Sequence, residues 1–195
     1  VFKGKFSKNI NKRDNSIKDT LKILRKEKII SNYYSLSINK KIPIFSGMGG
    51  GTSNSAAILK YFIKGKIKKN LMNILQKKIG SDLRLFFSKQ GFLTNLDQVI
   101  NFKKKHKLNL IIIYPNIRCS TREVYSKVFK YSMMSKPIIN NLIKKNKFIN
   151  YMNKEKNDLQ SIVEKKYPAI QRLITKINSL DGCHFSRMTG SGSAC

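Results

Sequence analysis

The sequence predicts an α+β fold, and three neighbouring features indicate it. Residues 34–39 alternate apolar and polar side chains, a pattern typical of a half-buried strand. The loop that follows places four glycines between Gly47 and Gly51. Residues 53–63 then carry apolar side chains at helical spacing. A strand, a glycine-rich loop and a helix in this order are typical of a phosphate-binding unit.

The composition of the loop favours a nucleotide phosphate as its ligand. Glycine adopts left-handed conformations and lets the backbone approach a ligand, and we expect such a conformation at Gly50. Thr52, Ser53 and Ser55 can cap the following helix, whose N-terminus attracts phosphate. The pattern is not a P-loop, since no lysine follows the glycines, and not a dinucleotide-binding loop, since Thr52 replaces the third glycine. The alternative is a flexible loop that binds nothing.

Two further helices are predicted in the first half of the chain. Asn15 and Ser16 are suited to cap the first, whose apolar face consists of Ile17, Leu21 and Leu24. The second ends at Gly80, and its apolar face consists of Leu71, Ile74, Leu75 and Ile79. Asp82 follows this helix end, where an acid is usually a cap or a turn residue.

The second half begins with a basic run, residues 103–107, which is the expected boundary between domains at 1–102 and 103–195. His106 in this run has no acid or nucleophile nearby in sequence, and we expect it on the surface. Strands are predicted at 108–114 and 183–188. Helices are predicted from Thr121 through Val128, at 158–166 and at 168–180. A second short loop of glycines and hydroxyl residues follows at 189–193.

The net charge is the most unusual property of the composition. It is +30 over 195 residues, from 40 Lys and Arg against 10 Asp and Glu. Because the basic residues are spread over the whole length, we interpret most of them as solvated surface. The alternative is a protein that binds nucleic acid through this charge. The three cysteines lie far apart and fit a reduced, cytoplasmic chain, and no apolar run is long enough to span a membrane.

The glycine-rich loop also resembles a motif of a known family. Residues 43–57 read Pro-x-x-x-Gly-Met-Gly-Gly-Gly-Thr-Ser-Asn-Ser-Ala-Ala, which is similar to the second motif of the GHMP small-molecule kinases. Further agreement, in the same order, comes from residues 80–82, 115–125, 157–160 and 187–192. The resemblance is closest to the branch that uses ATP to phosphorylate the 2-hydroxyl of 4-diphosphocytidyl-2-C-methyl-D-erythritol, in the methylerythritol phosphate pathway to isoprenoid precursors. It implies an N-terminal domain like domain 2 of ribosomal protein S5 and a ferredoxin-like C-terminal domain.

This resemblance implies which residues bind and react. ATP with Mg²⁺ would lie against the glycine-rich loop, and no residue is implied as a metal ligand. Asp82 would orient the attacking hydroxyl, while Thr121 and Tyr125 would contact the cytidine diphosphate end of a small-molecule substrate. The loop at 189–193 would pack against the phosphate loop. The residues implied to bind ATP are Asn15, Lys40, Pro43, Ile44, Phe45, Ser46, Gly47, Met48, Gly49, Gly50, Gly51, Thr52 and Ser53.

Other interpretations of these residues stay open. Asn15 and Thr121 could serve only as helix caps, and Tyr125, which replaces a phenylalanine of the family, could be a core residue. Arg84 stands where the family has a proline. The enzyme could also be a GHMP kinase for homoserine or mevalonate. Neither nucleic acid nor a membrane is expected as a partner, and the sequence does not reveal an oligomeric state.

Both ends of the sequence look cut by comparison with the family. We expect the N-terminal domain to lack its first strands and the C-terminal domain its last strand. In the family a lysine near the N-terminus pairs with the catalytic aspartate, and its segment would lie upstream of Val1. A chain without this lysine is expected to bind ATP weakly and to be inactive.

Overall fold

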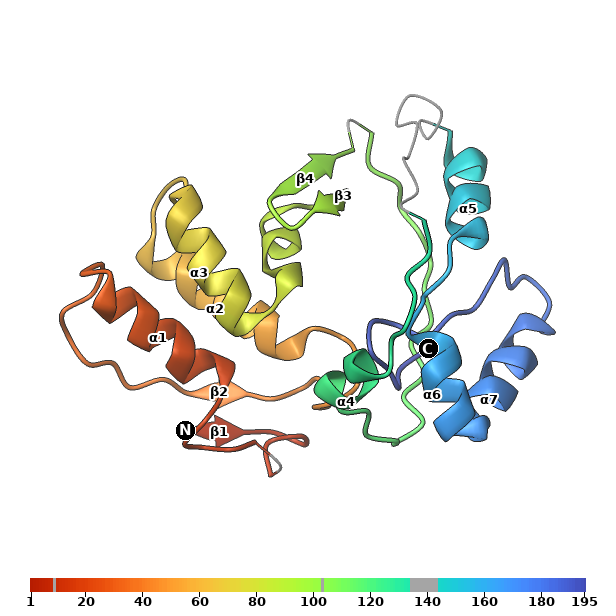
Figure 1. Ribbon diagram of the computed structural model, residues 1–195, viewed down its shortest axis with the longest axis horizontal. Helices are drawn as coiled ribbons and strands as arrows, with labels where there is room; N and C mark the ends of the chain where they lie inside the picture. Colours follow the sequence, from red (N-terminus) through yellow and green to blue (C-terminus); the bar gives the residue numbers. More distant parts are fainter. Residues whose placement is uncertain (9, 103, 134–143) are drawn as a thin grey trace. The chain divides into compact units, whose positions relative to one another are not determined.

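The computed structural model describes residues 1–8, 10–102, 104–133 and 144–195 (Figure 1). Its contacts divide the chain into two compact units. The first unit comprises residues 1–44 and 49–102, and the second comprises residues 45–48 and 103–195. The glycine-rich loop therefore contributes to both units, since the chain enters the second unit at Phe45 and returns to the first at Gly49. Lys103 and residues 134–143 of the predicted second domain lie outside the described residues.

The first unit is built mainly from helices. These are α1 (Ser16–Lys26), α2 (Gly50–Phe62), α3 (Lys69–Ile79) and the 3-10 helix η1 (Ser81–Phe87). Figure 1 shows α1, α2 and α3 packed side by side. Each of these three helices, and η1 as well, contributes a leucine with no exposed surface to the shared core. These leucines are Leu24, Leu59, Leu75 and Leu83. The helical periodicity of the sequence is thus confirmed, except that Ile74 of the predicted apolar face is 43% exposed.

The strands of the first unit are short. β1 (Phe2–Lys3) pairs in parallel with β2 (Ile38–Asn39), and β3 (Gly91–Asn95) forms an antiparallel hairpin with β4 (Gln98–Asn101). The strand predicted over residues 34–39 is therefore too long. Among the residues that the structure describes, β1 pairs with only its last two residues, Ile38 and Asn39. Tyr34 instead packs on Phe62, with 4.7 Å between the ring centroids.

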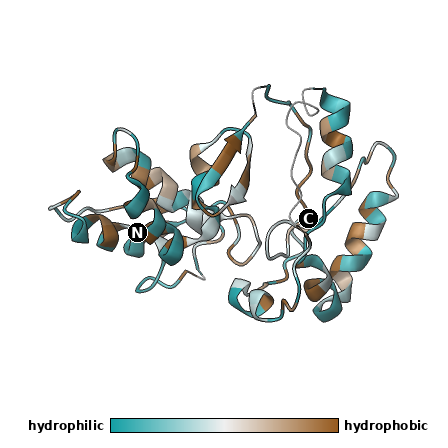
Figure 2. Cartoon of the chain, turned by 45° about the horizontal axis from the view of Figure 1, so that its top comes forward, coloured by the Kyte–Doolittle hydropathy of each residue, from teal (hydrophilic) through white to brown (hydrophobic). Residues whose placement is uncertain are grey.

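The second unit contains α4 (Thr121–Ser126), α5 (Lys145–Lys154), α6 (Gln160–Lys166) and α7 (Pro168–Asn178). Figure 2 shows hydrophilic and hydrophobic residues alternating along the helices, as amphipathic helices require. The apolar sides of α4, α6 and α7 meet in a core that consists of Cys119, Val124, Leu159, Val163, Ile170, Ile174 and Met188. Helix α4 is shorter than predicted, since it ends before Val128.

Three predictions for the second unit are wrong. No strand is assigned at 108–114 or at 183–188. Leu110, Ile111 and Ile112 are exposed, and the two backbone hydrogen bonds that Ile113 exchanges with Cys195 do not extend into a ladder. His106 is not on the surface either. It is 6% exposed and stacks on Phe148 of α5. Among the residues that the structure describes, no helix is long and apolar enough to cross a membrane.

Candidate functional site

The N-terminus of α2 forms the centre of the candidate site in the first unit. The helix begins at Gly50, three residues earlier than the sequence predicts, because Gly49 takes a left-handed conformation (φ 61°, ψ 21°) as its N-cap. The carbonyl of Gly49 accepts the first helical hydrogen bond, from the Ser53 N–H, at 2.9 Å. The N–H groups of a helix's first turn have no partner inside the helix, and this first turn carries no acidic residue. Both features favour an anion here.

The glycines with left-handed backbones differ from the one expected, Gly50. Gly47 (φ 74°) and Gly49 (φ 61°) have left-handed backbones, whereas Gly50 is the first helical residue. Gly50 nevertheless has close neighbours. A Cβ at this position would lie 2.9 Å from the Lys40 Nζ and 3.1 Å from the Ile42 Cγ2. A side chain at position 50 would therefore displace the Lys40 ammonium and press on Ile42, while the backbone conformation of Gly50 is an ordinary helical one.

The structure places Asp82 beside this helix N-terminus. Asp82 lies in the first turn of η1, and its Oδ1 is 3.3 Å from the Thr52 hydroxyl, which donates the hydrogen bond. A Cβ on Gly49 would approach the Asp82 Oδ2 to 3.3 Å, and one on Gly80 would approach the Oδ1 to 2.8 Å. The glycines at 49 and 80 therefore leave the space that this carboxylate occupies. Asp82 and Thr52 are 30 residues apart in sequence, and the fold brings them together.

Lys40 is the buried cation near the same helix end. Its side chain is 5% exposed, and burial lowers the pKa of its ammonium group below the ordinary value. Its closeness to Gly50, given above, places the ammonium at the first turn of α2. This position fits the predicted role of Lys40 at the nucleotide, which stays a prediction.

The N-termini of α1 and α2 are tied together by hydroxyl groups. Ser16 donates from its Oγ to the Gly51 carbonyl at 3.0 Å, and Ser55 donates to the Ser16 carbonyl at 3.2 Å. Apart from the capping pattern, no sequence signal indicates these bonds. Asn15 is the N-cap of α1, since its side chain accepts from the Lys18 N–H. A role of Asn15 at the nucleotide stays a prediction.

In the second unit, the first half of the glycine-rich loop packs against the second glycine loop. The Ser46 carbonyl accepts from the Ala194 N–H at 3.1 Å, and the Gly47 carbonyl accepts from the Thr189 hydroxyl at 3.3 Å. A Cβ on Gly47 would lie 2.0 Å from the Thr189 carbonyl oxygen and 2.7 Å from the Gly192 nitrogen. This is the packing between the two loops that the resemblance implies.

Thr121 and Tyr125, the predicted substrate contacts, lie on α4. The Thr121 hydroxyl is 2.9 Å from the hydroxyl of Ser191 in the second glycine loop. The N-cap of α4 is Ser120, so the alternative of Thr121 as the cap is wrong. Tyr125 is 49% exposed and does not belong to the core, which leaves much of its ring accessible.

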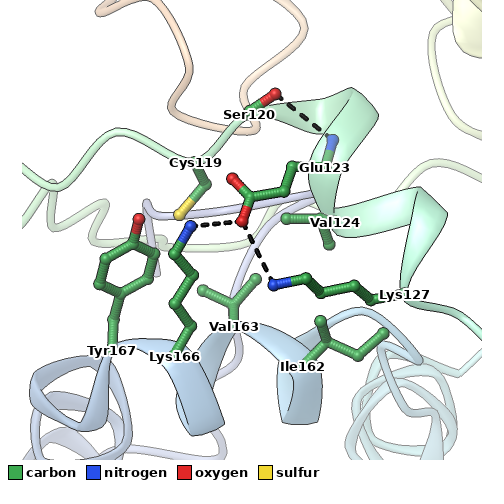
Figure 3. A pocket seen from close by; sticks show the side chains of 9 residues that line it. All are labelled: Cys119, Ser120, Glu123, Val124, Lys127, Ile162, Val163, Lys166 and Tyr167. Carbon is green, nitrogen blue, oxygen red and sulfur yellow. Dashed lines mark hydrogen bonds and ion pairs between the residues drawn. The ribbon is translucent and has the colours of Figure 1, made fainter.

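A small pocket between α4 and α6 shows how α4 is held (Figure 3). Glu123 points into it and forms ion pairs with Lys127, the C-cap of α4, and with Lys166 at the end of α6 (Figure 3). Hydrogen bonds from these two lysines lower the pKa of the Glu123 carboxyl, while burial raises the pKa of the neighbouring Cys119 thiol. The Glu123–Lys166 pair thereby joins the helix that carries Thr121 and Tyr125 to α6.

The described residues contain no group of three or more His, Cys, Asp or Glu side chains that could hold a metal ion. Thr52 and Asp82 supply oxygen atoms, which are the donors that Mg²⁺ prefers.

The chain is similar in sequence to known proteins. Residues 15–82 match the GHMP kinases N terminal domain, a range that includes the glycine-rich loop and Asp82. The 4-diphosphocytidyl-2-C-methyl-D-erythritol kinase of Pelagibacter ubique is 38% identical over 198 residues, which cover 99% of this chain and 69% of the relative. The enzyme of the same name from Ureaplasma parvum is 33% identical over 186 residues, which cover 90% of this chain and 67% of the relative.

A solved structure shows the same fold. The crystal structure of a 4-(cytidine 5'-diphospho)-2C-methyl-D-erythritol kinase superposes with a TM-score of 0.64 and covers 100% of this chain and 71% of its own. The two sequences are 18% identical. The predicted α+β fold of the GHMP kinases is therefore confirmed.

Proposed function

Because this chain belongs to the GHMP kinases, in the family of the 4-diphosphocytidyl-2-C-methyl-D-erythritol kinases, we propose that it transfers the γ-phosphate of ATP to the 2-hydroxyl of 4-diphosphocytidyl-2-C-methyl-D-erythritol. The observation that carries this proposal is the contact between Asp82 and Thr52 at the N-terminus of α2. It joins a carboxylate to the place where the first turn of a helix favours phosphate. Phosphoryl transfer depends mainly on such positioning and on charge stabilisation.

The triphosphate would bind the N-terminal turn of α2, near the buried ammonium of Lys40. Asp82 would accept a hydrogen bond from the attacking hydroxyl and take its proton as the bond to phosphorus forms. The hydrogen bond from Thr52 would hold the Asp82 carboxylate in a single orientation. Mg²⁺, when bound, would neutralise charge on the phosphates, and the Thr52 hydroxyl is suited to hold it together with phosphate oxygens.

The cytidine end of the substrate would contact α4. The Tyr125 ring is half exposed and offers a face on which a pyrimidine can stack. The Thr121 hydroxyl, held by Ser191, offers a hydrogen bond of defined direction. Both residues lie on α4, which the Glu123–Lys166 ion pair connects to α6.

The proposed activity is tested by offering the full-length enzyme three alcohols. ADP formation is followed with ATP, Mg²⁺ and either 4-diphosphocytidyl-2-C-methyl-D-erythritol, homoserine or mevalonate. We expect turnover with the cytidine-linked alcohol and background rates with the other two. An equal or higher kcat/KM for homoserine or mevalonate would contradict the proposed substrate, and the absence of turnover with all three would contradict the proposed reaction.

Replacing Tyr125 with alanine should raise the KM for the cytidine-linked substrate about 10-fold, because stacking of a base on an aromatic ring contributes about 1–3 kcal/mol. The KM for ATP should stay the same. Tyr125→Phe is the matched control, since it keeps the ring and removes only the hydroxyl. A KM that is unchanged in Tyr125→Ala would remove this residue from the substrate site.

A further inference from the structure

Arg84 lies two residues after Asp82 in η1. Its guanidinium makes three hydrogen bonds inside the first unit. Nε donates to the Gln76 Oε1 at 2.7 Å and to the Leu96 carbonyl at 3.1 Å, and Nη2 donates to the Asn73 Oδ1 at 3.0 Å. Arg84 thereby connects η1 to α3 and to the turn of the β3–β4 hairpin.

Gln76 completes this network from the side of α3. Its side chain is 8% exposed, and its Nε2 donates to the Ser81 carbonyl at 3.0 Å and to the Leu96 carbonyl at 2.6 Å. The Ser81 carbonyl belongs to the peptide bond that precedes Asp82. A buried amide without hydrogen-bond partners is costly. The hydrogen bonds of Gln76 with Arg84 and with the two carbonyls therefore stabilise one conformation of the turn that precedes Asp82.

The 3-10 helix that carries Asp82 needs such support. It is seven residues long, whereas 3-10 runs longer than three or four residues are uncommon because their hydrogen bonds are poorly aligned. The network of Arg84, Gln76 and the Leu96 carbonyl supplies this support.

We propose that Arg84 is a positioning residue that, through Gln76 and the Leu96 carbonyl, holds the Asp82-bearing turn in the geometry for phosphoryl transfer. This inference rests on the proposed function, in which Asp82 orients the attacking hydroxyl. Arg84 itself does not touch the substrate. Its effect is therefore on kcat and not on the affinity for ATP.

The test compares variants of the full-length enzyme in the ADP-release assay. Arg84→Met keeps the length of the side chain and removes every donor. It should lower kcat about 10- to 100-fold, because a displacement near 1 Å at a catalytic group can cost about 100-fold. The KM for ATP should stay within about twofold, which excludes a loss of ATP binding as the cause. The kcat is calculated per folded enzyme, with the folded fraction measured by circular dichroism, so that partial unfolding is not counted as a loss of turnover. Arg172→Met, an exposed arginine of α7, is the control and should match the parent.

Arg84→Lys is the conservative variant. It keeps a cationic donor, but one ammonium cannot reproduce the fork of a guanidinium, so its kcat should lie between those of Arg84→Met and the parent. A parental kcat in Arg84→Met would overturn the inference, and so would a kcat in Arg84→Lys as low as that of Arg84→Met. If Arg84→Met does not fold, the comparison of Arg84→Lys with the parent carries the test, and a parental kcat in Arg84→Lys would then overturn the inference.

The parent enzyme separates this inference from the proposed function. An inactive parent would contradict the function, whereas an active parent with an equally active Arg84→Met variant contradicts only the role of Arg84.

Discussion

Replacing Asp82 with asparagine should lower kcat by about two to four orders of magnitude, the usual range for the loss of a general base. The amide keeps the size of the side chain and can still accept a hydrogen bond from Thr52, so the fold around η1 should persist. It cannot take the proton of the attacking hydroxyl. ATP affinity, measured by calorimetry, should barely change, because the phosphates bind the N-terminal turn of α2 in the proposed site.

Asp97→Asn is the matched control for this experiment. Asp97 is the acid of an exposed ion pair with Lys69 in the same unit, and its neutralisation removes the same charge from the chain. Its kcat should equal that of the parent. Turnover of Asp82→Asn within a few-fold of the parent would show that Asp82 is only a turn residue, as its sequence neighbourhood alone suggests.

Gly47→Ala should weaken ATP binding and destabilise the second unit. Alanine at φ 74° is strained, and its Cβ would lie 2.0 Å from the Thr189 carbonyl oxygen. One of the two loops must therefore move. We expect ATP affinity to fall at least about 10-fold, since a shift of the loop displaces groups that must meet the phosphates.

Gly182→Ala separates the strain of a left-handed alanine from the clash with Thr189. Gly182 has nearly the same backbone conformation (φ 77°), but a Cβ there would have nothing within 4 Å. It should show only the cost of the left-handed backbone, about 1–2 kcal/mol, with unchanged ATP affinity. Equal unfolding free energies and equal ATP affinities for the two variants would mean that the contact with Thr189 does not matter.

The helices and the loop could be predicted from sequence because their signals are local. The faces of α1, α2 and α3 follow from residues three and four positions apart, and each of these helices buries a leucine as expected. The glycine-rich loop and the segment around Asp82 were recognised from short runs of residues, and the match to the GHMP kinases confirms the family.

The errors concern features that depend on distant partners. A strand exists only where another strand pairs with it, and the described residues provide no ladder for the apolar run at 108–114. The burial of His106 depends on Phe148, 42 residues away in α5. The left-handed glycines are 47 and 49 because the second glycine loop and the start of α2 lie against them.

The sequence by itself determined that this chain carries a glycine-rich loop before a helix, an aspartate after a helix end and amphipathic helices, because each is encoded within a few neighbouring residues. Only the tertiary structure decided three contacts. Asp82 accepts a hydrogen bond from Thr52, the buried ammonium of Lys40 lies beside Gly50, and Arg84 donates a hydrogen bond to Gln76. These contacts join residues from different elements, and their distances follow from how the helices pack around a common core.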